Sequence, residues 1–167
     1  MELIASATRD WGIGIRGGLV RRLKDDMRFF REKTAGSVVI LGRATLESFP
    51  GGKPLKNRTH IVLSAKEGYS PEGVTVCASV PAALAEVKRL HAEKVFVIGG
   101  ASVYRAFLPY CQSAYITRMD ISAEADRFLP DLDREPGWEL TDPGEEMECD
   151  GVSFRFTKYE NHAVKEY

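Results

Sequence analysis

The stretch Lys94-Val-Phe-Val-Ile-Gly-Gly-Ala-Ser-Val-Tyr104 decides the fold class of this chain. Its residues 95–98 are all apolar, which is typical of a strand that is covered on both faces of a sheet. Gly99-Gly100 ends the strand, and apolar residues then recur at helical spacing as far as Phe107. This order predicts an α/β fold with a central, mostly parallel sheet of about eight strands and helices on both faces.

The Gly99-Gly100 turn is also an expected ligand position. In open α/β sheets, ligands bind at the carboxyl ends of the central strands. Two residues without a Cβ atom let a ligand approach the backbone, and the N–H groups that begin the next helix can bind a phosphate. Alternatively, the two glycines form only a tight turn, and this stretch by itself leaves both interpretations open.

The composition indicates an ordinary globular protein with one domain over residues 1–167. Hydrophobic residues make up 44% and charged residues 28%, which is enough to build a core. The net charge of −1 gives no indication of nucleic acid or an anionic membrane as a partner. No apolar run approaches the ~20 residues of a membrane span, and the N-terminus does not resemble a signal peptide. Three scattered cysteines without a C-x-x-C pair predict free thiols, no metal site and a cytoplasmic location.

Periodicity predicts the other elements in chain order. Strands are expected at 2–8, 37–41, 59–63, 74–76 and 114–119, and helices at 23–33, 43–48 and 80–90, the last capped by Ser79. The alternating segments 138–141 and 152–159 predict an antiparallel hairpin at the C-terminal sheet edge, joined by an acidic connection.

A glycine-rich segment follows the first strand. Gly12-Ile-Gly14-Ile-Arg-Gly17 matches the dinucleotide fingerprint G-x-G-x-x-G. The fingerprint requires a helix that begins within the motif, whereas helical periodicity here begins only near Leu23. We therefore interpret residues 9–18 as a flexible loop that closes over a ligand.

Asp26 is the most informative single residue. Leu23, Met27 and Phe30 form one apolar stripe at 100° per residue, and Asp26 lies inside that stripe. A carboxylate on a buried face is costly unless it is paired or protonated, so its position indicates a function. The alternative, an acidic residue favoured by the helix dipole, explains Asp25 better than Asp26.

Two arginines occupy positions where a cleft is expected. Arg43 follows an apolar strand at the start of a helix, and Arg58 follows a Pro- and Gly-rich loop. A guanidinium at either position could bind phosphate or carboxylate, although each could also be an ordinary surface charge.

The chain also carries a series of motifs with a specific order and spacing. They are Leu3-Ile-Ala-Ser6, Trp11-Gly-Ile-Gly14, Leu23-Lys-Asp-Asp-Met-Arg-Phe-Phe30, Val39-Ile-Leu-Gly-Arg-Ala-Thr45, Pro54-Leu55 with Arg58, Val97-Ile-Gly-Gly-Ala-Ser-Val-Tyr104, Tyr115-Ile-Thr117 and Asp126-Arg-Phe-Leu-Pro130. Over nearly its whole length the chain resembles the dihydrofolate reductase family. The resemblance implies hydride transfer from NADPH to C6 of 7,8-dihydrofolate with protonation at N5. It also implies a monomer that binds antifolates and has no nucleic-acid or membrane partner.

By position, the resemblance implies a substrate site around Asp26. Asp26 would hold N3 and the 2-amino group of the pterin, with Thr117 bonded beside it, and Tyr104 completes the implied catalytic set. Arg58 would bind the α-carboxylate of the folate glutamate. The other implied substrate-binding residues are Ile4, Ala5, Met27, Phe30, Phe49, Leu55 and Ile98, where Ile4 and Ile98 would use their backbone carbonyls.

The resemblance implies an NADPH groove next to this site, with the loop from Gly12 to Leu23 closing over the nicotinamide. The implied cofactor-binding residues are Ala5, Ile13, Gly14, Gly42, Arg43, Ala44, Thr45, Leu63, Ser64, Ile98, Gly99, Gly100, Ala101, Ser102, Val103 and Tyr104.

This sequence departs from the family pattern in the closing loop and near Phe49. The family usually has Pro-Trp where this chain has Val20-Arg21, which affects loop closure. We expect Arg21 to point to water instead of toward Asp26, because two adjacent buried guanidiniums would leave an unpaired charge. Pro50-Gly51-Gly52 is one residue longer than is common in the family.

A further departure concerns the 2′-phosphate of NADPH. Positions that are often basic in the family are Ala44, Ala78 and Ser102 in this chain. Arg43, helped by Lys66, therefore remains as the expected phosphate partner, and a modest preference for NADPH over NADH is predicted.

Two alternative functions remain open at this point. A related reductase of riboflavin synthesis acts on a ribosylated pyrimidine, and it would need a phosphate site in place of Arg58. A catalytically silent nucleotide-binding protein of the same fold is the second alternative, which Val20-Arg21 makes conceivable.

Overall fold

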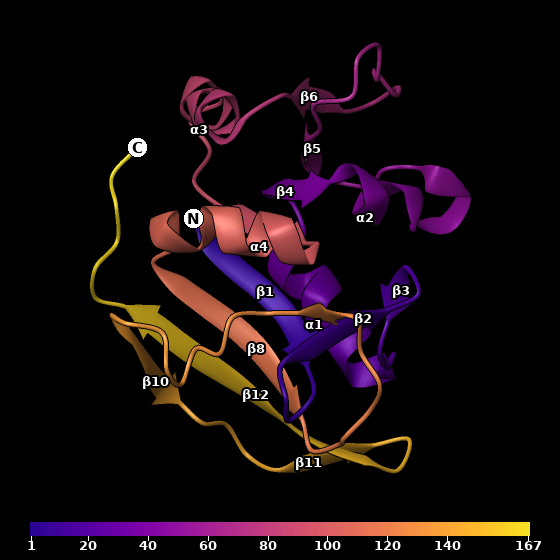
Figure 1. Ribbon diagram of the computed structural model, residues 1–167, viewed down its shortest axis with the longest axis vertical. Helices are drawn as coiled ribbons and strands as arrows, with labels where there is room; N and C mark the ends of the chain where they lie inside the picture. Colours follow the sequence, from indigo (N-terminus) through magenta and orange to yellow (C-terminus); the bar gives the residue numbers. More distant parts are fainter.

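A nine-stranded sheet runs through the computed structural model, which describes residues 1–167 (Figure 1). Its strands are β1 (Glu2–Ala7), β4 (Val38–Gly42), β5 (Thr59–Leu63), β6 (Thr75–Cys77), β7 (Val95–Gly99), β8 (Ser113–Met119), β10 (Trp138–Asp142), β11 (Met147–Cys149) and β12 (Val152–Asn161). The order is β10-β12-β8-β1-β7-β4-β5-β6, with β11 beside β12. All pairs from β8 to β6 are parallel, and β12 is antiparallel to its neighbours. The predicted fold class is confirmed.

Strand β7 lies at the centre of this sheet, between β1 and β4, and all five of its residues are buried. Val97 pairs with Leu3 on one side and with Ile40 on the other, and all three side chains belong to one buried cluster. Phe96 and Ile98 belong to a second cluster, because successive side chains of a strand point to opposite faces. The non-alternating apolar run therefore reflects coverage of both faces.

Four α-helices cover the two faces of the sheet. They are α1 (Lys24–Thr34), α2 (Arg43–Glu47), α3 (Val80–Arg89) and α4 (Ala101–Phe107). Helices α3 and α4 lie on the near face in Figure 1, and they contribute Leu84, Val87 and Phe107 to the first cluster. Helices α1 and α2 cover the other face, where Leu46 and Phe30 pack in the second cluster. Two short 3₁₀ helices, η1 (Pro50–Gly52) and η2 (Leu108–Tyr110), complete the helical segments.

The glycine-rich segment after β1 is not a loop, so this prediction is wrong. It forms β2 (Gly12–Ile15) and β3 (Gly18–Leu19), which join β9 (Arg127–Phe128) in a three-stranded sheet. A Cβ atom at Gly12 would lie 2.7 Å from Cβ of Ala125, and one at Gly14 would lie 3.0 Å from the carbonyl of Gly18. These glycines therefore allow other segments of the same chain to approach closely, whereas the sequence suggested only flexibility.

The predicted antiparallel pairing at the C-terminal sheet edge is confirmed, because β10 pairs with β12, but the connection between them holds a further strand. The edge strand is β10, while β12 lies between β8 and β10. The acidic connection contains β11, which pairs with the start of β12 around a two-residue turn. Asp150 and Gly151 in this turn both have positive φ angles, of 51° and 77°, as a tight hairpin requires.

No helix of the structure has the length and apolar character that crossing a membrane requires, and the longest, α1, has 11 residues.

Candidate active site

Asp26 on α1 lies against the carboxyl ends of two parallel strands. The Thr117 hydroxyl on β8 donates a hydrogen bond of 2.6 Å to Oδ1 of Asp26, and Thr117 itself is buried. Ser6 on β1 is the register partner of Thr117, and its hydroxyl also faces the carboxylate. Burial raises the pKa of Asp26, and the two hydroxyl contacts oppose this shift only in part. The site thus holds a carboxyl group among hydroxyls, with no ion pair to any basic residue.

The packing of α1 explains why Asp26 faces inward, but it differs from the predicted apolar stripe. Leu23 precedes the helix, which begins at Lys24, and it packs with Met119, Val152 and Phe154 in a separate cluster. The predicted stripe through Leu23 is therefore wrong. The aromatic residues at positions 29 and 30 lie one turn after Asp26 and hold α1 on the sheet. The ring of Phe29 stacks on Phe156, with centroids 4.5 Å apart.

Tyr104 on α4 connects the glycine turn with the first strand. Its hydroxyl donates a 2.8 Å hydrogen bond to the carbonyl of Ile4, and its ring is buried. Burial and the charge of Asp26 raise the pKa of Tyr104, so its hydroxyl stays protonated. A Cβ atom at Gly99 would lie 3.5 Å from this ring, and the Gly99-Gly100 peptide bond is cis.

The starts of α2 and α4 lie close together at the ends of β4 and β7. The registers of β7, β4 and β5 bring Gly99, Gly42 and Leu63 to the same end of the sheet. A Cβ atom at Gly42 would lie 3.2 Å from Cγ2 of Val103, and a Cβ atom at Gly100 would lie 3.4 Å from the hydroxyl of Thr45. The predicted cofactor residues of these segments therefore lie together, and the missing Cβ atoms let the starts of α2 and α4 approach one another. The members of this set at the ends of β4 and β5 and on α2 and α4 are Gly42, Arg43, Ala44, Thr45, Leu63, Ser64, Ala101, Ser102 and Val103.

Arg43 is the first residue of α2, and its guanidinium is only partly engaged. Nη1 pairs with Oε1 of Glu47 at 3.0 Å on the exposed side of the helix. Its guanidinium carbon also lies 6.0 Å from the centroid of the Tyr69 ring. Both partners are exposed or half-buried, so Arg43 can exchange this contact for a phosphate.

Arg58 is held in place by neutral oxygen atoms. Its Nε donates to the Thr34 hydroxyl at 2.8 Å, and its two terminal nitrogens donate to the carbonyls of Arg31 and Lys56. Thr34 is fully buried and donates in turn to the carbonyl of Phe30 at 2.8 Å. Arg58 makes no ion pair, so this fixed guanidinium keeps a charge that an external carboxylate can neutralise. The sequence contained no signal for the role of Thr34, because it depends on a contact across 24 residues.

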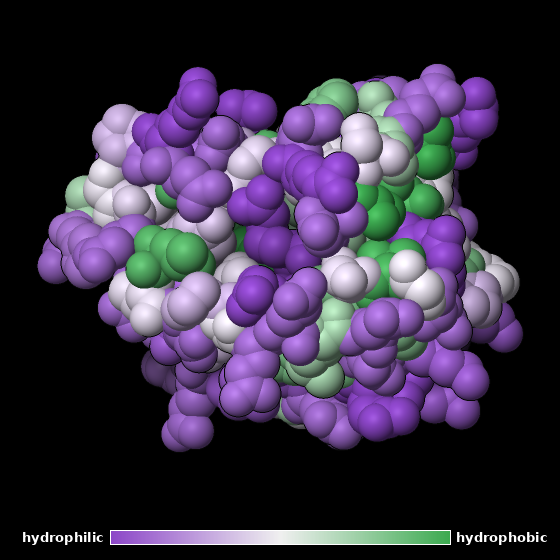
Figure 2. All heavy atoms as spheres, turned by 90° about the horizontal axis from the view of Figure 1, so that it is seen from below, coloured by the Kyte–Doolittle hydropathy of each residue, from purple (hydrophilic) through white to green (hydrophobic).

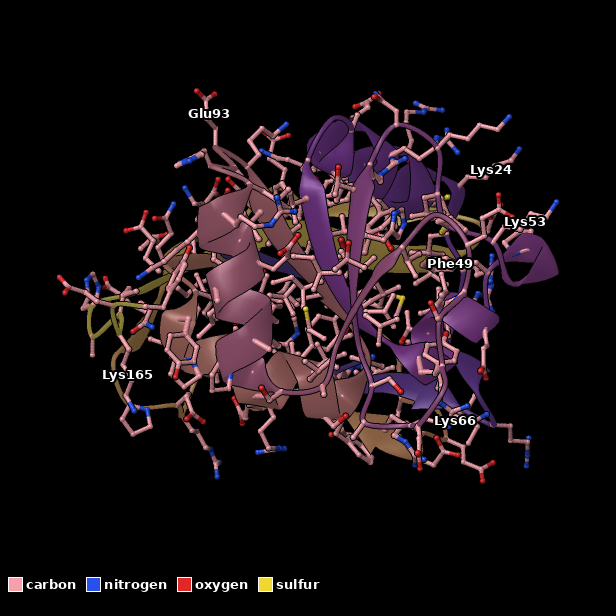
Figure 3. The ribbon with its side chains drawn as sticks, turned by 90° about the horizontal axis from the view of Figure 1, so that it is seen from above. Lys24, Phe49, Lys53, Lys66, Glu93 and Lys165 are labelled. Carbon is pink, nitrogen blue, oxygen red and sulfur yellow. The ribbon has the colours of Figure 1, made fainter.

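Apolar side chains surround the space between these groups. Phe30 and Phe49 are half-buried against the second cluster, and Met27 and Leu55 are also half-buried. Figure 2 shows apolar residues exposed among charged ones on the face toward which β1 and β8 run in Figure 1. Figure 3 shows the side chains of Lys24 and Lys53 extending away from the ribbon at the same end of the molecule as Phe49.

Arg21 lies away from the carboxylate of Asp26. Its Nη2 donates to the backbone carbonyl of Asp150 at 3.3 Å, in the turn between β11 and β12, and the side chain is exposed. Arg21 thus connects residues 12–23 to the turn between β11 and β12. Its exposed side chain agrees with the predicted orientation toward water. Val20 lies next to Ile13, since the amide of Val20 donates to the carbonyl of Ile13 at 3.4 Å.

A separate hollow of about 350 Å³ lies at the ends of β8 and β12. Its charged residues pair with one another, with Arg9 2.6 Å from Asp120 and Arg155 3.9 Å from Glu146. None of the predicted site residues lines it, so we assign it no role in the site.

Comparison with known proteins decides the family. The family model described as dihydrofolate reductase matches residues 1–161. The chain belongs to the dihydrofolate reductase family. The dihydrofolate reductase of Neisseria meningitidis is 35% identical over 159 residues, which cover 95% of this chain and 96% of that protein. A bifunctional dihydrofolate reductase-thymidylate synthase of Glycine max is 36% identical over 149 residues, and these cover 79% of this chain but only 28% of the bifunctional protein.

A solved structure of the same family has the same fold. The dihydrofolate reductase of Enterococcus faecalis, complexed with NADP(H) and RAB-propyl, superposes with a TM-score of 0.84 at 36% sequence identity. The alignment covers 96% of this chain and 95% of that chain. The nine-stranded sheet and its helices therefore form a dihydrofolate reductase fold.

The contact of Arg21 with Asp150 leads to a prediction about the pH dependence of turnover. Replacing Arg21 with alanine should shift the apparent pKa of the pH–rate profile by much less than one unit, because no guanidinium contributes to the environment of Asp26. The measurement is kcat/KM for dihydrofolate between acid and neutral pH, with Arg22→Ala as the matched control. An upward shift of about one unit or more would show that Arg21 reaches Asp26 in solution.

The position of Arg43 predicts its role in cofactor preference. Arg43→Ala should remove most of the preference for NADPH over NADH, roughly a tenfold or greater change, because a charge-assisted contact to the 2′-phosphate is lost. The ratio of kcat/KM for the two cofactors measures this preference, and Arg105→Ala on α4 serves as control. An unchanged ratio would mean that another residue recognises the phosphate.

Proposed function

We propose that this chain reduces 7,8-dihydrofolate to 5,6,7,8-tetrahydrofolate with NADPH and so supplies one-carbon metabolism. The observation that carries the proposal is the half-buried Asp26 carboxyl, which accepts a hydrogen bond from Thr117 and has no basic partner. The family assignment supports the same reaction. A spectrophotometric assay of NADPH oxidation with dihydrofolate tests it directly, and an inactive protein would favour the silent nucleotide-binding alternative.

In this proposal Asp26 binds and orients the pterin. One carboxyl group can accept hydrogen bonds from N3 and from the 2-amino group, which lie side by side on the ring. The Thr117 hydroxyl occupies Oδ1 at 2.6 Å and fixes the orientation of the carboxyl plane. A raised pKa suits a group that participates in protonation of N5 near neutral pH, because proton transfer is most efficient when the pKa is close to the ambient pH.

Arg58 is proposed to bind the α-carboxylate at the far end of the folate. Three neutral acceptors hold its guanidinium before the substrate arrives, so little side-chain freedom is lost on binding. Partial burial and, to a smaller extent, the charge of Arg31 lower the pKa of Arg58, which nevertheless remains protonated. The half-buried Met27, Phe30, Phe49 and Leu55 are proposed to line the slot between the two ends.

NADPH, which supplies the hydride when bound, is proposed to lie across the starts of α2 and α4. Gly42, Gly99 and Gly100 let the backbone approach its phosphates, and Thr45 offers a hydroxyl donor. Ala5, Ile13, Gly14 and the carbonyl of Ile98 are proposed to flank the nicotinamide near Asp26. Arg43 is the proposed 2′-phosphate partner, together with Ser64 and Lys66 on the segment after β5.

Other features of the proposal are supported less directly. The matching relatives described above carry the name dihydrofolate reductase, which does not favour the pyrimidine reductase alternative. Antifolates are expected to bind in the pterin site. The single domain, the monomeric state, the cytoplasmic location and the absence of a nucleic-acid partner stay predictions.

The proposed role of Asp26 predicts a loss of turnover on substitution. Asp26→Asn should bind NADPH normally but reduce dihydrofolate roughly 10²–10⁴-fold more slowly, because it removes a positioned acid–base group. Single-turnover rates and NADPH affinity measure the two effects, and Asp25→Asn is the matched control. Near-normal turnover of Asp26→Asn at neutral pH would contradict the assignment.

The raised pKa of Asp26 also predicts a gain in stability for the same variant. The native state binds a proton more tightly at Asp26 than the unfolded state does, so stability falls as pH rises from the unfolded pKa through the folded one. Asp26→Asn removes this cost, and its melting temperature should exceed that of the parent protein near neutral pH but not at acid pH. Thermal melts at the two pH values test this.

The isolated charge of Arg58 predicts a substrate-specific effect. Arg58→Leu should weaken dihydrofolate binding by about 1.5–3 kcal/mol, the value of a hydrogen-bonded contact to a charged group. A dihydropterin without the glutamate tail should bind equally well to both proteins. Equal losses with both substrates would identify Arg58 as a structural residue.

A further inference from the structure

His60 on β5 is the only buried histidine of the chain, with 2% of its surface exposed. It is paired in register with Val39 of β4, and it lies two residues before Val62. Both valines belong to the second cluster, against which Phe30 and Phe49 also pack. His60 therefore lies on the sheet face that carries the proposed folate slot, although it is too deeply buried to touch a substrate.

The His60 ring makes one defined contact. Its Nε2 accepts a 3.0 Å hydrogen bond from the backbone N–H of Leu55. An acceptor at Nε2 requires the neutral tautomer with its proton on Nδ1. Nδ1 is buried and has no hydrogen-bond partner, which is unfavourable for a polar atom in the interior.

This contact holds the Leu55 end of residues 54–58, while the Asn57 carbonyl accepts a 2.8 Å hydrogen bond from the N–H of Gly36 at the other end. The N–H of Leu55 is the only amide in this segment that donates a hydrogen bond. The segment carries two residues of the proposed slot, Leu55 in its wall and Arg58 at its end. Burial lowers the pKa of His60, the backbone of Arg58 opposes this shift in part, and the Arg58 charge adds to it, so Nε2 stays available as an acceptor.

We propose that His60 is a positioning residue for recognition of the folate tail, holding the Leu55–Arg58 segment in place through the hydrogen bond from Leu55 to Nε2. This inference rests on the proposed function, because the segment would contact the aminobenzoyl-glutamate portion of the substrate. Asp26 and the residues proposed to flank the nicotinamide lie on other elements of the fold. His60 therefore affects binding of the tail and leaves hydride transfer unchanged.

The test compares His60→Leu with His60→Gln, whose Oε1 can replace Nε2 as acceptor. Each is assayed with dihydrofolate and with a 7,8-dihydropterin that carries only a methyl group at C6. We expect His60→Leu to raise KM for dihydrofolate about tenfold, with kcat within about twofold and no change for the tail-less substrate. His60→Gln should restore most of the affinity. His162→Leu, on the exposed C-terminal edge, is the control.

Other outcomes overturn the proposal. Equal losses with both substrates, a change in kcat alone, or no change in KM would show that His60 does not position the tail site. Turnover by the parent protein separates this question from the proposed function. If the parent protein is inactive with dihydrofolate, the proposed function fails, and dissociation constants for folate from fluorescence quenching then decide whether His60→Leu weakens tail binding. A parent protein that does not bind folate overturns both.

Discussion

The burial of β7 on both faces is the constraint on which the rest of the structure depends. A strand without a solvent face must have neighbours on both sides and helices above and below, and β1, β4, α4 and α1 meet this requirement. The end of such a strand is the one place where its backbone becomes accessible. Gly99-Gly100 occupies that end, so the proposed cofactor and pterin sites share one edge of the sheet.

The site combines groups that differ in how they are held. Asp26 is half-buried without a counter-charge, and its desolvation raises its pKa. Arg58 is half-exposed and fixed by three neutral oxygens, which leaves its full charge for the substrate. The first arrangement lowers the stability of the fold in return for chemistry, whereas the second limits the loss of side-chain freedom when the substrate binds.

Short buried hydrogen bonds connect these groups to the sheet. Thr117 orients Asp26, Thr34 holds Arg58, and His60 holds the amide of Leu55. All three side chains are buried and would be invisible in a search for surface polar residues. In the proposal, Thr34 and His60 do not contact the substrate themselves. Each fixes the position of a residue that does. Loss of one such bond should move a contact by a fraction of an ångström without unfolding the chain.

The sequence alone determined the α/β class, the glycine junction after β7 and the choice of Asp26 over Asp25, because periodicity encodes which face of each element is buried. The resemblance to the family added the pairing of Asp26 with Thr117 and the role of Arg58. Only the tertiary structure decided which residues meet. Leu23 packs with the C-terminal strands, and Arg21 binds Asp150. The glycines of β2 allow other segments of the chain to approach closely. These contacts join residues far apart in the chain. Local patterns do not contain them, because they depend on how separately encoded elements pack together.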